Sequence, residues 1–248
     1  MSKKSEVSQS YMESQKKQHC WKPNSMFPNV LITGDKRPGS IGEAIRLSLP
    51  RSDVTSFDYD ITKQFDMSLS QFDTLIMCHG AMHLDWFELA PLDELAHVVD
   101  VNLTGTINLT HKFVRHTINN PVRKRIISIG SMAYTKVLNG SAVYCASKAG
   151  LAMFMKCLAW ELAPKGFDVF SIHPSNTADT PMSNETIEGL MRYRNLSCEE
   201  ATAYWNDSIP RDKILSREDI AELVVFLLSS RASSYLSGTN LELAGGQR

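Results

Sequence analysis

The chain alternates short apolar runs with polar turns and amphipathic stretches. Runs bounded by turn residues are typical of strands that are buried on both faces of a sheet. Such runs lie at 29–34, within 53–59, at 125–130 and at 167–172. Helical periodicity follows the first run at 44–47 and returns at 217–228. The alternation predicts an α/β fold.

Length and composition indicate a single compact domain. The 248 residues are 43% hydrophobic and 21% charged, with a net charge of −1, and a chain of this size buries a large core. The balanced charge predicts no nucleic-acid partner, and the short basic runs are interpreted as solvated surface. We find no apolar run long enough to span a membrane and expect no membrane partner.

Residues 1–26 are polar and rich in Ser, Lys and Gln. They predict a flexible tail ahead of one domain at 27–248, because they lack the apolar core of a secretory signal and the arginines of a mitochondrial presequence. The five cysteines show no disulfide framework. A reducing, cytoplasmic setting is therefore expected.

The most informative chemistry is a tyrosine and a lysine four residues apart, Tyr144 and Lys148. A helix places both side chains on one face. A phenol titrates near 10, so a proton shuttle at neutral pH needs its ionised form stabilised by about 4 kcal/mol, which a neighbouring ammonium can supply. The pair predicts an acid–base site, although such a pair is also common on exposed helices.

Ser131 follows the strand at 125–130 and precedes Tyr144 by thirteen residues. This arrangement resembles the short-chain dehydrogenase/reductase family, in which a serine, a tyrosine and a lysine at this spacing form the catalytic core. Asn102 matches the asparagine of that family's tetrad. The resemblance covers about 29–246 and implies a single doubly wound, Rossmann-type parallel sheet of about six to seven strands with helices on both faces.

The turn after the first strand resembles the family's dinucleotide-binding loop. Glycines let the backbone approach a pyrophosphate, and a helix amino terminus offers free N–H groups. The loop is two residues longer than the family pattern, with Ser40 in place of a glycine, and resembles that of the enoyl reductase branch. That branch spaces its tyrosine and lysine more widely, so the loop geometry transfers and the reaction does not. Residues 40–43 have the form of a capping box. Candidate cofactor-binding residues here are Gly34, Lys36, Arg37, Ser40 and Ile41.

The sequence gives opposing signals about the preference for NAD(H) or NADP(H), which differ in one phosphate on the adenosine ribose. Asp58 stands where the family has an acid that bonds the ribose hydroxyls, and it would repel the extra phosphate of NADP. Lys36 and Arg37 would attract that phosphate. We favour NAD, because the acid acts at closer range than two mobile cations.

The stretch after Asp58 is unusually short. Asp60 and Ile61 resemble the start of the aspartate-valine-threonine with which the family touches adenine, yet a crossover helix needs a dozen or more residues. The helix and strand usually found between these features are therefore expected to be shortened or missing. This predicts about six strands instead of seven.

Two further segments match the family's cofactor pocket with changes. Residues 78–80 replace asparagine-alanine-glycine, with Gly80 retained as a cofactor-binding candidate. Cys78 and His79 are interpreted as structural, since no ligand spacing indicates a metal. Residues 173–182 resemble the segment that holds the nicotinamide carboxamide, where the candidates are Pro174, Thr177 and Thr180.

Substrate choice is expected in the irregular segment at about 182–210, which is rich in large side chains and follows a strand end where ligands bind in this fold. A surface helical hairpin is the alternative. The family's subunit contacts, made by the last strand and the tyrosine-bearing helix, imply a homotetramer rather than a homodimer.

The resemblance implies an NAD(P)-dependent oxidoreductase that interconverts a secondary alcohol and a ketone, such as a 3-oxoacyl or similar apolar carbonyl. Tyr144 and Lys148 would serve both catalysis and cofactor binding, Ser131 would bond the substrate oxygen, and Asn102 would position a water. An epimerase or dehydratase is disfavoured, because no separate substrate domain follows. The alternative is a catalytically silent nucleotide-binding or regulatory protein, which the altered turn and altered segments motivate.

Overall fold

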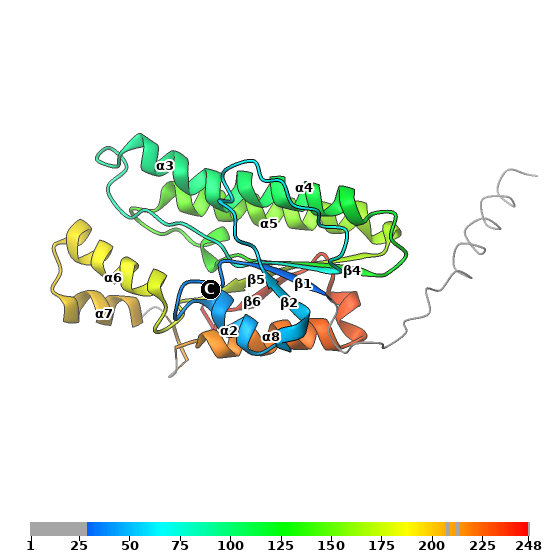
Figure 1. Ribbon diagram of the computed structural model, residues 1–248. Helices are drawn as coiled ribbons and strands as arrows, with labels where there is room; N and C mark the ends of the chain where they lie inside the picture. Colours follow the sequence, from blue (N-terminus) through cyan, green and yellow to red (C-terminus); the bar gives the residue numbers. More distant parts are fainter. Residues whose placement is uncertain (1–28, 207–208, 212–213, 248) are drawn as a thin grey trace, which may run out of the picture.

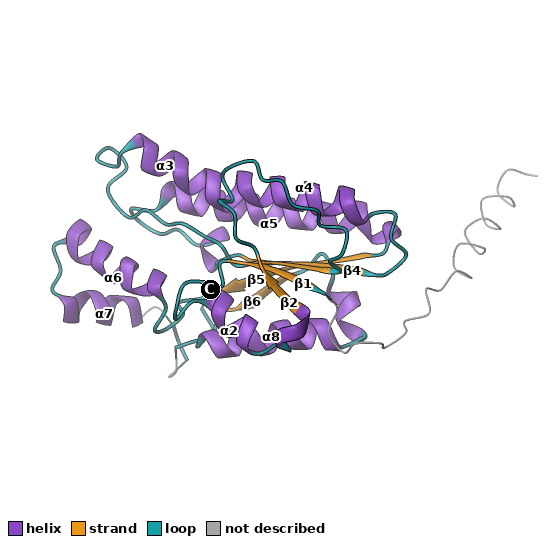
Figure 2. Ribbon diagram, in the orientation of Figure 1, coloured by secondary structure: helices purple, strands orange, loops and turns teal. Residues whose placement is uncertain are grey.

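The computed structural model describes residues 29–206, 209–211 and 214–247. The expected tail at 1–26 lies outside this part of the chain. The described residues form a sheet covered by helices on both faces, as Figures 1 and 2 show.

Six strands form one sheet in the order β2-β1-β3-β4-β5-β6, and every neighbouring pair is parallel. The strands are β1 Val30–Thr33, β2 Val54–Ser56, β3 Thr74–Met77, β4 Lys124–Ile129, β5 Phe167–Pro174 and β6 Asn240–Leu243. The central strands β1, β3, β4 and β5 are buried along their whole length, which is why they read as continuous apolar runs.

The shortened crossover is confirmed. Residues 57–73 link β2 to β3 and contain neither helix nor strand. Phe57, Leu69 and Phe72 of this link are buried in the core on one side of the sheet. The link therefore covers the sheet with side chains where a longer chain would use a helix.

Helices cover both faces of the sheet. They are α2 Ile41–Leu47, α3 Leu92–Val99, α4 Thr106–Thr117, α5 Ala142–Leu162, α6 Pro181–Arg194, α7 Cys198–Asn206 and α8 Arg217–Ser229. Helices α2 and α8 pack on one face, and α4 and α5 on the other (Figure 2). The doubly wound prediction is confirmed.

The chain from Ala142 to Lys165 is, within the described residues, long and apolar enough to cross a membrane by length and composition. The statement that no run reaches this length was therefore wrong. The helix packs along β5, and Leu151, Met155 and Leu162 are buried in the domain core. A core helix of a folded domain gives the same signal.

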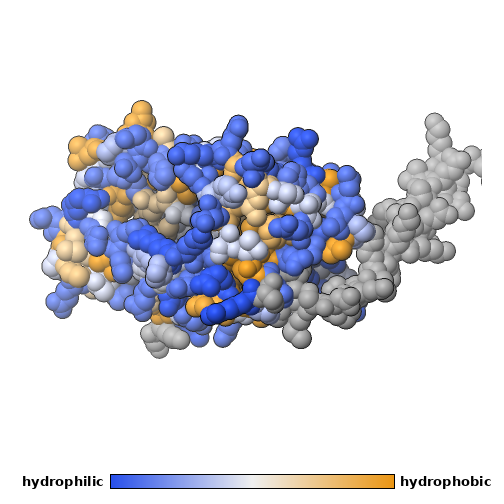
Figure 3. Space-filling view, in the orientation of Figure 1, coloured by the Kyte–Doolittle hydropathy of each residue, from blue (hydrophilic) through white to orange (hydrophobic). Residues whose placement is uncertain are grey.

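The segment expected to be irregular at 182–210 is largely helical, with α6 and α7 joined by a short turn. Thr180 caps α6 in a capping box with Ser183, and Asn195 ends the helix in the left-handed region at φ 55°. Leu84 of the body packs with Leu190 of α6 and Ala201 of α7 in a separate cluster. In the space-filling view this face is mostly hydrophilic, with apolar side chains both at the end that carries α3 and α6 and near the middle (Figure 3).

Candidate active site

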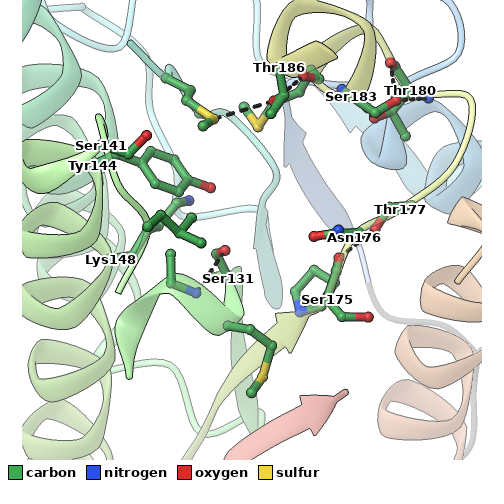
Figure 4. A pocket seen from close by; sticks show the side chains of 18 of the residues that line it. Ser131, Ser141, Tyr144, Lys148, Ser175, Asn176, Thr177, Thr180, Ser183 and Thr186 are labelled. Atoms are coloured by element: carbon green, nitrogen blue, oxygen red, sulfur yellow. Dashed lines mark hydrogen bonds between the residues drawn. The ribbon is translucent and has the colours of Figure 1, made fainter. Parts of the chain in front are cut away.

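The serine, tyrosine and lysine meet at one cavity. Ser131 follows β4 and caps a short 3-10 turn by accepting a hydrogen bond from the Ala133 N–H at 3.1 Å. Tyr144 and Lys148 lie on the first turns of α5, and all three side chains line the cavity (Figure 4). A strand end and a helix start thus bring together groups that are far apart along the chain.

The electrostatics differ from the expectation for the tyrosine. Burial raises the pKa of the Tyr144 phenol, and its hydrogen bond with Ser131 opposes that rise. Burial lowers the pKa of Lys148 to about 8, and its Nζ lies 3.3 Å from the Ile129 carbonyl oxygen and 5.7 Å from the Tyr144 ring centroid. Desolvation of the phenol outweighs the hydrogen bond with Ser131, so the pKa of Tyr144 is raised and the expected depression is not found here.

Asn102 lies in a π-helical turn, Asp100–Gly105, a distortion that is frequent at functional sites. Its side-chain oxygen accepts from the Ala81 N–H at 2.9 Å. Its amide donates to the Ala81 carbonyl at 2.9 Å and to Ser147 Oγ at 3.0 Å. The Asn102 side chain therefore ties the loop after β3 to α5, and Asn102 is not among the residues that line the cavity.

His79 completes a hydrogen-bonded chain beneath the site. Thr106 donates its hydroxyl to the Asn102 carbonyl at 3.0 Å, so it accepts from His79 Nε2 at 2.8 Å. His79 Nδ1 then accepts from the Thr33 hydroxyl at 2.7 Å. This geometry requires neutral histidine, and burial, assisted by the charge of Lys148, lowers the pKa of His79 to about 3.

Cys78 and His79, which were interpreted from the sequence as structural, both line the cavity. Among the described residues, no group of three His, Cys, Asp or Glu side chains is arranged to hold a metal. Burial also raises the pKa of the Cys78 thiol, so it is not poised as a nucleophile. The sequence gives no signal for the His79 chain, because its members come from β1, the loop after β3 and α4.

The turn after β1 brings backbone atoms into close contact. Gly34 has φ +69°, and a Cβ there would lie 2.7 Å from the backbone of Cys78. Ser40 caps α2 by accepting from the Glu43 N–H, as expected, but Glu43 bonds the N–H of Gly39 instead of that of Ser40. The capping box is thus displaced by one residue, which accommodates the longer loop.

The cavity has a volume of about 1040 Å³, at the upper end of the usual range for ligand sites. Of the residues expected to bind the cofactor, those that line it together with the tyrosine and lysine are Gly34, Arg37, Ser40, Ile41, Gly80, Pro174, Thr177 and Thr180. The cavity suits a dinucleotide in three respects: its volume, its glycine turn without room for side chains, and its cationic lining.

A family model described as enoyl-(acyl carrier protein) reductase matches residues 44–248. The chain belongs to the short-chain dehydrogenase/reductase family. It is 30% identical to a 3-oxoacyl acyl-carrier-protein reductase FabG of Rickettsia bellii over 177 residues, which are 69% of this chain and 66% of that protein. It is also 30% identical to an acetoacetyl-CoA reductase of Shinella zoogloeoides over 197 residues, 79% of this chain and 76% of that protein.

Solved structures of short-chain dehydrogenases/reductases share the fold. An NAD⁺-bound xylitol dehydrogenase superposes with a TM-score of 0.76 at 22% identity, covering 88% of this chain and 97% of that one. An actinorhodin polyketide ketoreductase with NADPH superposes with a TM-score of 0.77 at 20% identity, covering 90% and 98%. The named relatives act on CH–OH or C=O groups, and this family member is an NAD(P)-dependent oxidoreductase of that kind.

Four residues expected to contact the cofactor of this short-chain dehydrogenase/reductase do not line the cavity: Lys36, Asp58, Asp60 and Ile61. Lys36 and Asp58 form an exposed ion pair with each other. Asp60 accepts from the Thr62 N–H at 2.9 Å, and Ile61 lies against Gly105 with atoms as close as 2.8 Å to a Cβ built there. The short link after β2 therefore uses these residues for its own turn and packing.

Two lining residues of this short-chain dehydrogenase/reductase, Leu84 and Lys136, had no sequence signal, whereas Leu190, Arg194 and Trp205 lie in the 182–210 segment that was expected to determine substrate choice. Leu84, from the loop after β3, packs with Leu190 of α6 and Trp205 of α7 at one end of the cavity. Helices α6 and α7 are together called the lid. Lys136 and Arg194 bring positive charge to the same cavity. None of these residues sits in a family motif, and only the tertiary fold assembles them.

Proposed function

We propose that the protein interconverts a ketone and a secondary alcohol, with Tyr144 as the general acid and base. The observation that carries this proposal is the convergence of Ser131, Tyr144 and Lys148 on one cavity. Two hydroxyls that can donate to a single substrate oxygen, with an ammonium beside them in a buried site next to a glycine turn, suit carbonyl chemistry.

In the reductive direction, Tyr144 gives its phenolic proton to the carbonyl oxygen as charge develops there. Ser131 donates a hydrogen bond to the same oxygen, and the Lys148 ammonium stabilises the phenolate that remains. A bound nicotinamide would supply the hydride in this direction and accept it in the reverse. Asn102 supports the site by tying α5 to the loop after β3, and it would position a proton-relay water.

For the cofactor, we propose NAD in preference to NADP. Lys36, which would attract a second phosphate, is paired with Asp58, and Arg37 is paired with Glu185 at 2.6 Å. Both cations are thus partly neutralised. Replacing Asp58 with Ala frees Lys36, so we expect the ratio of Kd values to move towards NADP; an unchanged ratio would clear Asp58 of this role.

For the substrate, we propose a 3-oxoacyl or similar carbonyl compound that enters under α6 and α7. Apolar side chains such as Met82, Leu84 and Leu190 line the lid end of the cavity, and the named relatives act on 3-oxoacyl compounds. This lining would accept the alkyl part of such a substrate.

The test is a reductase assay on a panel of ketones and 3-oxoacyl thioesters with NADH and NADPH, followed by cofactor absorbance. Turnover of at least one ketone class is expected. Binding of cofactor without turnover of any ketone would favour the silent nucleotide-binding alternative. Reduction of enoyl thioesters only would assign the enoyl reaction named in the family description.

We also propose a homotetramer, with a homodimer as the smaller alternative. Two large apolar side chains on the outer side of α5 are solvent-exposed, Met153 at 61% and Trp160 at 86%, and apolar surface of this kind on a long helix suits a subunit contact. Light scattering checks the oligomer, and a monomer at micromolar concentration would refute it.

A further inference from the structure

The lining of the active-site cavity is strongly biased in charge. Four basic residues line it, and no Asp or Glu does so among the described residues: Arg37, Lys136, Lys148 and Arg194. The whole chain is almost balanced, with 26 Lys and Arg against 27 Asp and Glu. A cavity with one sign of charge and low-dielectric walls concentrates ligands of the opposite sign.

Two of these cations already have roles. Lys148 stands beside Tyr144, and Arg37 belongs to the turn after β1 and is paired with Glu185. Lys136 and Arg194 remain, and neither forms a salt bridge with the described residues. Two half-buried cations without a carboxylate in a shared cavity point to a ligand that brings the negative charge.

Arg194, the last residue of α6, is held at the lid end of the cavity by aromatic rings. Its guanidinium carbon lies 4.3 Å from the Tyr204 ring centroid and 5.9 Å from that of Tyr193. Rings hold a guanidinium through its flat face and leave the N–H groups at its edge for hydrogen bonds. Those edge groups match a carboxylate or a phosphate, which accepts two parallel hydrogen bonds.

Lys136 lies in the loop between β4 and α5, on the side of Ser131 and Tyr144. Burial lowers the pKa of its ammonium, and its side chain lines both the main cavity and a neighbouring one of about 330 Å³. Its charge adds to the positive potential at the mouth of the site. The anion-binding geometry itself is supplied by Arg194.

We propose that the substrate carries an anionic group, a carboxylate or a phosphate, at a distance from its reacting carbonyl, and that Arg194 binds this group. The proposal rests on the proposed function, because it uses the same cavity. It narrows the substrate class to keto acids or keto phosphates.

The experiment compares substrates that differ only in charge. Methyl keto acids of increasing chain length, beginning with laevulinate, are assayed against their methyl esters, and acetol phosphate is assayed against acetol. At the best-fitting length, kcat/KM for the acid is expected to exceed that for the ester by about 10- to 100-fold, the range of a hydrogen bond to a charged group. Comparing the acetol phosphate result with the keto acid result shows whether the site prefers a phosphate or a carboxylate.

Arg194→Gln is expected to bring this preference to within about threefold of unity, chiefly by raising KM for the acid. Arg192→Gln is the matched control. Arg192 lies on the same helix, bonds the Leu84 carbonyl at 3.4 Å and does not line the cavity. It should keep the preference of the wild type.

Calorimetric titration with alkanoates and methyl alkanoates of the same chain lengths, in the presence of cofactor, measures binding at this site without turnover. If the wild type shows equal kcat/KM and equal affinity for acids and esters, the inference is overturned and the proposed function still holds. Ketones that are never reduced, combined with an alkanoate preference lost in Arg194→Gln, would overturn the proposed function and keep the anion site.

Discussion

His79 makes stability depend on pH in a way that can be worked out in advance. Its two ring nitrogens are both engaged, one accepting from Thr33 and one donating to Thr106, whose hydroxyl continues to Asn102. A second proton, on Nδ1, would point at the Thr33 hydroxyl, which already donates its own proton to that nitrogen. The native protein therefore resists protonation of His79.

The sign and size follow from linkage. The native pKa of His79 is about 3, against an ordinary value of 6.5. As pH falls below 6.5, the unfolded chain takes up a proton that the native chain does not, so the free energy of unfolding decreases by about 1.4 kcal/mol per pH unit until about pH 3. Between neutral pH and about pH 5, this one group removes about 2 kcal/mol.

His79→Gln tests this reasoning, because glutamine keeps a donor and an acceptor but does not titrate. Urea unfolding, monitored by tryptophan fluorescence at about pH 7 and pH 5, gives the free energies. The variant is expected to be less stable than the wild type at neutral pH but to lose about 2 kcal/mol less on acidification.

Other groups titrate in both proteins and cancel in the comparison. His111→Gln, on the exposed side of α4, is the control, since this histidine takes no part in the buried chain of hydrogen bonds. Equal losses in the wild type and in His79→Gln would show that the ring is not held neutral, and the hydrogen-bond assignment would fail with it.

Two further outcomes follow from the site. Gly42→Ala would place a methyl 2.5 Å from the Gly34 carbonyl oxygen, so the free energy of unfolding should fall by about 1–3 kcal/mol. Gly80→Ala is the control, because its methyl meets nothing closer than 3.4 Å, and it should be nearly as stable as the wild type. Equal stability of the two variants would contradict the packing around Gly42. Because the pKa of Lys148 is about 8, reductase kcat/KM should fall as pH rises through that value. Lys148→Arg should move the alkaline limb upwards, and an unmoved limb would exclude Lys148 as its source.

Much of the fold could be predicted because its signals are local. A buried parallel strand must be apolar on both faces, so β1, β4 and β5 are visible as runs. The missing crossover before β3 followed from counting residues against the length that a helix requires. The lid was wrongly expected to be irregular, since α6 and α7 owe their helical form to a capping box and to packing on Leu84.

The site was predictable only in part. Ser131, Tyr144 and Lys148 have fixed spacing along a strand end and a helix, so their motif carries their geometry. Asp60 and Ile61 sit in a link whose own turn and packing use them. Arg194 reaches the cavity only through tertiary structure, and no spacing in the sequence reports that.

The most direct test of the central claim is Tyr144→Phe, assayed for ketone reduction beside a measurement of cofactor Kd. Loss of the phenolic proton donor is expected to lower kcat by about 10²- to 10⁴-fold, with the Kd of the cofactor within a few-fold of the wild type. Full turnover by Tyr144→Phe would contradict the account, because the phenol would then have no part in moving the proton.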